Sequence, residues 1–408
     1  LLLNVATNTM LRKEPEKGGG LGSLVSSALT AFGLSTRPNR ADLVDPVADQ
    51  FQPLHDMVTS PDGGKSPSLA AQYISALAKV QVRLESLFGA GTQWDQVKAY
   101  IDSIANNLGS NEFQDVNRLT QLIGRQCNTR STQPIGPLLE QPMRQAWSAM
   151  LKDAGYHLDG LWRTQISDGF KRDLESGFPF SQSGRDVPLA TVAQFLKPHE
   201  GTLDAFYDKE LRMFLAAEGE GYTPRTFMGN SQVAFSSSFL EFIAKMNAFR
   251  HALFPPGMPD IAISFDLTPD STPGVTETLL AIDGQQIRYR NEAPMPVAMS
   301  WPSKSGAPQA RLTISLQGTG ERPSTPAVEG EWALFRLLSQ ARIVAQSPTT
   351  YTILWSLSGS DGTRRDVRYK LQARSIRNPF GAEFFRGVVC PERVTQLPAI
   401  SSGYQPSR

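Results

Sequence analysis

Histidine and cysteine, which bind metals in many proteins, are scarce in this chain of 408 residues. The four histidines are His55, His157, His199 and His251. No two of them are spaced to form a metal-binding pair on one helix, and His199-Glu200 lacks the second histidine of an H-E-x-x-H motif. The two cysteines, Cys127 and Cys390, are too few for a thiolate zinc cluster. We therefore predict no metal site and no cofactor.

Carboxylates occur in two close pairs, Asp204 with Asp208 and Glu218 with Glu220. Two carboxyl groups that flank a glycosidic bond can act as the acid and the base or nucleophile of a glycosidase. Both pairs lie on or beside an amphipathic helical pattern, where a solvated helix face is the ordinary explanation. We predict that the chain is not an enzyme, and we keep an enzyme that acts on the cell wall as an alternative.

Two glycine-rich segments resemble the loops of known active sites without completing them. Gly63 to Ser66 reads like the end of a P-loop, but the first glycine of that motif would fall at Thr59, and no strand precedes it. Gly359 to Gly362 is one residue shorter than the G-x-S-x-G elbow of serine hydrolases and lies where a hairpin turn is expected. Neither segment predicts nucleotide binding or a catalytic serine.

A row of basic residues lies in the last quarter of the chain. It consists of Arg364, Arg365, Arg368, Lys370, Arg374 and Arg377. Nucleic-acid binding by such a row would need exposed aromatic side chains between the charges, whereas strand alternation points Tyr369 inward. Protection of a sheet edge explains the charge as well. We predict no nucleic-acid partner and keep a glycan-binding module as a further alternative.

The composition predicts a folded protein of two or three domains, because 40% of its residues are hydrophobic and its length exceeds that of one usual core. No stretch approaches the roughly 20 apolar residues of a membrane-spanning helix. The chain starts without Met and lacks the basic segment of a signal peptide, so we expect a fragment whose membrane segment lies upstream. Cys127 and Cys390 could pair in an oxidising compartment or remain buried thiols.

Apolar residues recur at three- and four-residue steps through residues 41–258, which predicts a helical domain. We expect helices to begin at Asp42 and at Ser66 or Ser68, which are capping residue types. Further helices are expected over Trp94–Ile104, Met143–Leu174, Leu203–Leu215 and Phe239–Leu253. Residues 1–40 have the composition of a helix end followed by a flexible linker.

Beyond Pro255-Pro256 the apolar period changes from 3.6 to 2, which predicts strands. Asp283-Gly284 and Asp361-Gly362 are typical of hairpin turns, and one helix, Trp332–Leu338, interrupts the strands. The sequence thus predicts an α+β, multidomain fold in which an all-α domain precedes an antiparallel β-sandwich-like domain. The expected boundaries are 41–258 for the helical domain, 259–376 for the sandwich, and 377–408 for an irregular C-terminal tail.

Several segments together resemble the IcmF/TssM family of type VI secretion proteins. The run from Phe178 to Tyr207 is similar to the family's C-terminal signature. Its matching residues are Phe178, Pro179, Phe180, Asp186, Val187, Phe195, Pro198, Gly201, Leu203, Asp204 and Phe206. Landmarks of the family's β domain and ending are similar to Ile282–Gln285, Trp301-Pro302, Gly330–Leu338, Asn378–Phe380 and Cys390-Pro391. The matches keep the family's order along nearly the whole chain.

The resemblance implies a structural component of the type VI secretion trans-envelope membrane complex, in the periplasmic region of a Gram-negative inner-membrane protein. It implies binding to the outer-membrane lipoprotein TssJ, and channel assembly with the inner-membrane protein TssL and further copies of the chain. Because loops between sandwich strands are polar and accessible, we predict the TssJ contacts in two of them. They consist of Thr268, Pro269, Asp270, Ser271, Thr272, Pro273 and Gly274, and of Pro302, Ser303, Lys304, Ser305, Gly306, Ala307 and Pro308.

Overall fold

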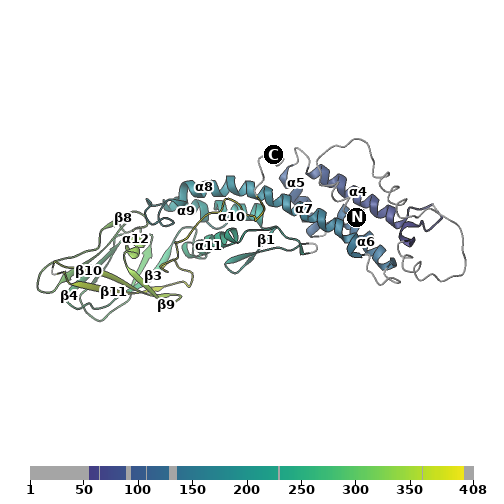
Figure 1. Ribbon diagram of the computed structural model, residues 1–408. Coiled ribbons are helices and arrows are strands. Elements are labelled where there is room, and N and C mark those ends of the chain that lie inside the picture. Colours follow the sequence, from purple (N-terminus) through teal and green to yellow (C-terminus); the bar gives the residue numbers. More distant parts are fainter. Residues whose placement is uncertain are drawn as a thin grey trace. The chain divides into compact units, whose positions relative to one another are not determined.

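A computed structural model of the chain describes residues 55–63, 65–88, 93–106, 108–127, 136–227, 230–360 and 362–398 (Figure 1). The chain divides into two compact units, one of residues 1–154, 226–233 and 398–408 and one of residues 155–225 and 234–397. The predicted linker and the start of the helix predicted at Asp42 lie outside the described residues. Among the helices described, none combines the length and the apolar character that a membrane span needs.

The first unit is built from packed helices. These are α4 (Leu69–Leu87), α5 (Trp94–Ala105), α6 (Glu112–Cys127) and the first part of α7 (Gly136–Trp162). The Ser68 side chain accepts a hydrogen bond from the N–H of Ala71 at 3.2 Å, which confirms one of the two predicted caps. The buried Phe113 ring packs edge-on against Tyr100 and Trp147, with centroids 6.2 and 6.0 Å apart. Aromatic contacts therefore join α5, α6 and α7.

The second unit begins with a long helical segment that runs to Glu175, as predicted for Met143–Leu174. After α7 it contains π-helical turns η1 (Arg163–Ser167) and η2 (Lys171–Glu175) on either side of α8 (Asp168–Phe170). Then follow α9 (Leu189–Leu196), α10 (Thr202–Phe206) and α11 (Ser237–Leu253). The buried Trp162 ring meets Phe206 and Phe239 edge-on at 5.6 and 5.0 Å, so it forms a centre of this helical core.

The predicted helix Leu203–Leu215 is wrong at its C-terminal end. The helix ends with the π-helical turn η3 (Tyr207–Leu211), and Leu215 starts a hairpin of β1 (Leu215–Glu218) and β2 (Gly221–Pro224). Gly219 closes this hairpin with a φ of 61°, which glycine adopts without a steric penalty. Leu215 is fully buried, as it would be on a helix, so its apolar spacing could not distinguish the two structures.

Two antiparallel sheets follow, with the strand orders β6-β3-β11-β10-β9 and β5-β4-β7-β8. The strands are β3 (Ile263–Pro269), β4 (Val275–Ile282), β5 (Gln285–Tyr289), β6 (Val297–Trp301), β7 (Gln309–Leu316), β8 (Val328–Glu329), β9 (Arg342–Ser347), β10 (Thr350–Ser358) and β11 (Arg364–Ala373). The hydroxyl groups of Tyr369 and Thr278 hydrogen-bond across the core at 3.0 Å, so the two sheets face each other. The predicted α+β fold with a sandwich-like β part is confirmed.

Turns and side-chain directions in the sandwich agree with the sequence patterns, with one exception. Asp283 and Gly284 have φ of 49° and 79°, as in a tight hairpin turn, and α12 (Ala333–Ser339) matches the predicted helix. Tyr369 points inward and is fully buried, as predicted. The basic row is not edge protection, however, because β11 is the central strand of its sheet.

The tail after Arg377 forms no regular helix or strand up to residue 397, which confirms the prediction that it is irregular. It is nevertheless packed, with Phe380, Phe385, Val388 and Cys390 buried. Near its end, Thr395 forms an isolated bridge with Phe235, just before α11. The tail therefore wraps back from the sandwich to the helices of the second unit.

Candidate functional site at the junction of helices and sandwich

The loop before α9 contacts the segment that forms α12, and we call this contact the junction (residues 178–187 and 330–336). Arg336 lies at its centre. Its Nε donates to Oδ1 of Asp186 at 2.7 Å, and its guanidinium lies 4.2 Å from the centroid of the Phe178 ring. The side chains of Arg336 and Asp186 are only 24% and 18% exposed. Removing one partner of a shielded, hydrogen-bonded ion pair strongly destabilises the folded protein, because it leaves the other charge without compensation.

Backbone groups on both sides of the junction are satisfied across it. Asp186 also accepts the backbone N–H of Trp332 at 3.2 Å, and the indole N–H of Trp332 donates to the carbonyl oxygen of Val187 at 2.7 Å. The Glu331 carboxylate accepts the N–H of Leu189 at 2.8 Å. That N–H belongs to the first turn of α9, where no helical partner exists. The sandwich segment therefore caps a helix of the preceding region.

Gly330 allows the two segments of the junction to approach so closely, and Gly184 allows the first segment to fold back on the residues before it. Gly330 has a φ of 109°, and a Cβ atom there would lie 2.1 Å from Oδ2 of Asp186. A Cβ atom on Gly184 would lie 2.0 Å from the carbonyl oxygen of Ser176. Any larger residue at either position would push the backbone or the Asp186 carboxylate aside.

Buried aromatic rings extend the junction into the sandwich and the tail. Trp301, at the end of β6, and Trp332 are fully buried with ring centroids 5.1 Å apart. Phe335 contacts Trp301 at 4.8 Å, and Phe385 of the tail contacts Trp332 at 5.7 Å. Each aromatic pair adds about 0.5–1.5 kcal/mol beyond its buried area, so the cluster joins three segments firmly.

Asp159 anchors the end of the tail to the long helical segment. Its carboxylate accepts the backbone N–H groups of Val394 and Thr395 at 2.8 and 2.9 Å, the Thr395 hydroxyl at 2.8 Å, and Nε of Arg393 at 3.0 Å. The indole N–H of Trp162 donates to the carbonyl oxygen of Pro391 at 2.7 Å. The family-like motifs at 178–187, 330–338 and 378–391 thus all serve packing contacts of the second unit.

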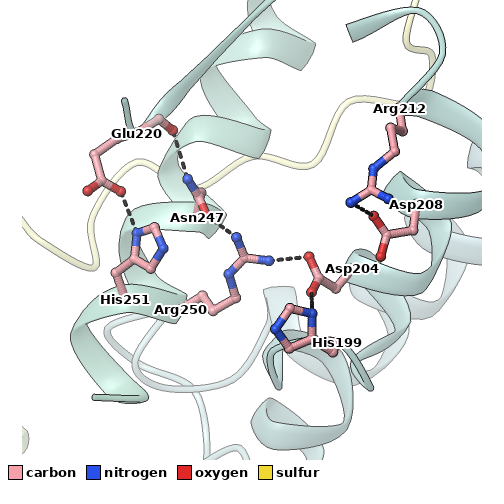
Figure 2. A network of polar contacts seen from close by, with 8 residues as sticks. All are labelled: His199, Asp204, Asp208, Arg212, Glu220, Asn247, Arg250 and His251. Atoms are coloured by element: carbon pink, nitrogen blue, oxygen red, sulfur yellow. Dashed lines mark hydrogen bonds and ion pairs between the residues drawn. The ribbon is translucent and has the colours of Figure 1, made fainter. Parts of the chain in front are cut away.

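Asp204 and Asp208 do not face each other across a cleft (Figure 2). Asp204 forms an ion pair with Arg250 and accepts the backbone N–H of His199 at 2.6 Å. Asp208 pairs instead with Arg212 at 3.0 Å. The cavity beside Asp204 and Arg250 measures about 20 Å³, which is room for roughly one water and not for a sugar ring. Both carboxylates therefore take part in structural ion pairs.

The same network ties the β1–β2 hairpin to α11 and to the start of the tail. His251 Nδ1 lies 2.7 Å from Oε2 of Glu220, and Nε of Arg377 lies 2.5 Å from Oε1 of that carboxylate. Asn247 donates from Nδ2 to the carbonyl oxygen of Glu220 at 3.1 Å (Figure 2). Glu218, the other member of the predicted pair, is exposed on β1.

The two predicted TssJ loops leave opposite ends of the sandwich. Ile263 pairs with Trp301, so β6 ends where β3 begins, and the loop over 302–308 follows there. The segment 268–274 begins in the last residues of β3 and continues at the other end, which we call the distal end. In this segment Pro269 and Thr272 are buried and only Ser271, Pro273 and Gly274 are exposed, whereas the 302–308 loop is exposed except at Ser303. The structure leaves their role as TssJ contacts a prediction.

Asp283 holds the 302–308 loop from the tip of the β4–β5 hairpin. Its side chain is buried, and no described group hydrogen-bonds to its Oδ1. Burial raises the pKa of Asp283 to about 6, although the backbone N–H groups of Ser303 and Gln309 bind the carboxylate and oppose this shift. Gly284 packs directly on Gly306, where a Cβ atom would lie 2.8 Å from its backbone. Sequence reasoning identified the turn but missed this buried acid.

The remaining candidate ligands are not gathered into a site. Among the described residues, no group of three or more His, Cys, Asp or Glu side chains is placed to hold a metal ion. Cys390 is a free, buried thiol whose pKa is raised to about 12 by burial. The side chain of Cys127 lies outside the described residues, as do Gly64 of the P-loop-like segment and Asp361 of the second predicted turn.

Comparison with protein families gives two matches within the second unit and its border. Residues 153–258 match the helical domain of the type VI secretion protein IcmF, and residues 265–375 match the C2-like domain of the same protein. The junction, the network of Figure 2 and the sandwich except the first two residues of β3 lie in this matched part.

Individual relatives extend the likeness. The type VI secretion system component TssM1 of Pseudomonas aeruginosa is 26% identical over 380 residues, which is 92% of this chain and 32% of that protein. The chain therefore spans about a third of this relative's length.

Solved structures show the same fold. A chain of a type VI secretion system membrane core complex superposes with a TM-score of 0.74 at 24% identity, over 97% of this chain and 79% of that chain. The C-terminal domain of TssM from EAEC, 28% identical, has a TM-score of 0.53 over 59% of this chain and 98% of its own length. With both IcmF domains present in order, this chain belongs to the IcmF/TssM family of type VI secretion proteins and corresponds to its C-terminal region.

Proposed function

We propose that this chain is a non-enzymatic, structural component of the trans-envelope membrane complex of the type VI secretion system. In this proposal it lies in the periplasm and binds the outer-membrane lipoprotein TssJ. It supports channel assembly with TssL and with further copies of the chain. Its relatives are a type VI secretion component and chains of type VI membrane complexes, which supports the assembly role.

The junction is the observation that carries the proposal. Motifs that mark the family, around Asp186 and around Trp332 to Arg336, are used to fix the sandwich to the helices, not to assemble a reactive group. A rigid body of this kind can hold its binding partners at fixed positions and bear mechanical load between them. An assembly protein needs this property, whereas an enzyme needs convergent catalytic groups in a cleft.

The partner site is proposed on the sandwich loops over 268–274 and 302–308. Because β3 separates their ends by roughly 20 Å, one loop can be tested independently of the other. Ser271 and Lys304 are exposed in their respective loops, so substituting them should leave the fold unchanged.

The test is calorimetric titration of the intact chain with its cognate TssJ lacking the lipid. We expect micromolar or tighter binding, weakened at least tenfold by Ser271→Arg or by Lys304→Glu, whichever loop is used. Gln286→Arg, an exposed change on β5 outside both loops, is the matched control and should bind as the native chain does. A folded native chain that fails to bind TssJ contradicts the partner assignment.

A periplasmic enzyme that acts on the cell wall, or a glycan-binding module, is the alternative to this proposal. The engagement of Asp204 by Arg250 and of Asp208 by Arg212 argues against a glycosidase pair. Release of soluble fragments from purified peptidoglycan by the native chain, lost in Asp208→Asn, would favour the enzyme instead.

A further inference from the structure

Three of the four edge strands of the sandwich are covered within the described residues. β5 and β6 are tied together by the Gln285 amide, which donates to the carbonyl oxygen of Ser300 at 2.8 Å and accepts its N–H at 3.1 Å. β8 contains only two residues. Beside it, the backbone N–H of Ile314 on β7 donates a hydrogen bond to the carbonyl oxygen of Pro323 at 2.9 Å. These arrangements leave little of three edges for another strand.

The fourth edge strand, β9, is open. Five of its six residues are exposed, and only Ile343 is half-buried. In the part of the chain that the structure describes, its backbone hydrogen-bonds to β10 alone. β9 contains one charged residue, Arg342, and neither lysine nor proline, the residue types with which natural sheets block an edge. The bulge in its pairing with β10 is confined to its C-terminal end, between Ala345 and Ser347. Val344, 40% exposed, stands on its outer face beside Thr352.

We propose that β9 is a self-association edge, at which β9 of a second copy of this chain adds antiparallel and extends the five-stranded sheet. The inference deepens the proposed function and rests on it for the premise that several copies assemble. Unpaired N–H and C=O groups along a strand are matched best by another extended strand. A second copy supplies one with an equally open edge, and a two-fold axis pairs the same surface from both sides.

The side chains of β9 permit such pairing in one symmetric register. Opposite residues must lie on the same face of the sheet, so a two-fold axis at Val344 places Arg342 opposite Gln346 and Ile343 opposite Ala345. No like charges then meet across the seam. The two Arg342 residues are separated by four residues along the strands, roughly 13 Å, which exceeds the screening length of about 8 Å in physiological salt. Each exposed Val344 is covered by its copy.

Disulfide trapping tests this register directly in the full chain. Opposed residues in an antiparallel pair have Cα atoms about 4.5–5.5 Å apart, within disulfide range. We expect Val344→Cys to form a covalent dimer under mild oxidation. Gln286→Cys, exposed on β5 and with the same native cysteines, is the matched control and should remain monomeric. The proposal is overturned if the two variants cross-link to the same extent. It is also overturned if Val344→Cys forms dimers in solution but no disulfide-linked dimer.

Sedimentation of the native chain and of Val344→Glu supplies a second readout. Two carboxylates facing each other at the axis should weaken self-association at least tenfold, while the exposed position keeps the circular dichroism spectrum unchanged. Self-association that is equal in both proteins, or absent from the native chain at its highest soluble concentration, contradicts the proposal. TssJ titration of the native chain and of Val344→Glu separates the two claims. If Val344→Glu binds TssJ and self-associates as the native chain does, only the β9 inference is wrong. If the native chain does not bind TssJ, the proposed function is contradicted.

Discussion

The two ends of the sandwich differ in what surrounds them. At one end, β6, α12 and the tail meet in a cluster in which Trp301 and Trp332 are fully buried. At the distal end, loops such as 290–296 are exposed, and Met295 there is 69% exposed. Ion pairs at the distal end are exposed too, such as Arg368 with Asp270 at 3.5 Å. One end is fixed to the helices by this cluster, although its 302–308 loop is exposed, whereas the distal end presents exposed loops and exposed ion pairs.

Breaking the junction should produce the largest loss of stability. Asp186→Ala leaves the shielded Arg336 without its carboxylate and the Trp332 N–H without an acceptor, so we expect a loss of about 3–5 kcal/mol in urea unfolding. Asp173→Ala is the matched control, because Asp173 pairs with Arg172 at 2.8 Å and the two side chains are 43% and 72% exposed. That exposed pair should contribute less than about 1 kcal/mol. Similar losses in both variants would mean that the junction is no stronger than a surface contact.

Releasing the tail should have the next largest effect. Asp159→Ala leaves the buried N–H groups of Val394 and Thr395 without an acceptor, at about 1–3 kcal/mol each. We expect a loss of about 3 kcal/mol together with faster proteolysis after Arg386. Glu383→Ala, which removes an exposed pair with Arg386 in the same tail, should leave the cleavage rate unchanged. Equal cleavage of the native chain and Asp159→Ala would show that Asp159 does not hold the tail.

A smaller and pH-dependent effect is expected at the buried acid under the 302–308 loop. The folded pKa of Asp283, about 6, is above its unfolded value of 3.8, so the folded state prefers the protonated form. The penalty from Asp283 is therefore fully present above pH 6 and disappears as pH falls through 6 to below 4. It amounts to at most about 3 kcal/mol.

Asp283→Asn should accordingly stabilise the chain at pH 7.5, by about 1–2 kcal/mol, since asparagine is neutral and also suits the positive φ before Gly284. The gain should vanish near pH 4 in thermal unfolding experiments. Asp270→Asn, which removes an exposed carboxylate that pairs with Arg368 in the other loop, serves as the control and should not stabilise the chain at pH 7.5. A gain that is constant across pH would show that turn geometry, not burial of charge, is responsible.

The distal end should show the smallest change in stability. Ser271→Arg is exposed and is expected to alter the free energy of unfolding by less than about 0.5 kcal/mol. A larger loss in the same urea experiment would place Ser271 in the packed structure and remove the contrast between the two ends.

Local patterns predicted the elements that have a strong period or a characteristic residue type. α11 and the inward Tyr369 follow from spacing, and the cap at Ser68 and the Asp283-Gly284 turn follow from residue type. β9 was missed because five of its six residues are exposed, so it has no alternation to detect. α6 was missed as well, although Ile123 and Val116 on it are buried.

The junction could not be derived from local patterns, because its partners are far apart in sequence. Asp186 and Arg336 are separated by 150 residues, and only the fold brings them together. The resemblance to the family marked both segments but gave no reason for their pairing. The same applies to Asp159, whose partners lie 235 and 236 residues further on. Long-range polar contacts of this kind leave no trace in composition or period.

Hydrogen exchange followed by mass spectrometry tests most directly whether the junction makes one body of the helices and the sandwich in the second unit. In the native chain, we predict that amides of α11 and β10 open with the same free energy. In Asp186→Ala the opening free energies of the amides in α11 and in β10 should both fall, by the same amount as the free energy of unfolding measured in urea. If β10 keeps its native protection while α11 loses it, the two regions fold independently, and the junction does not perform the role assigned to it.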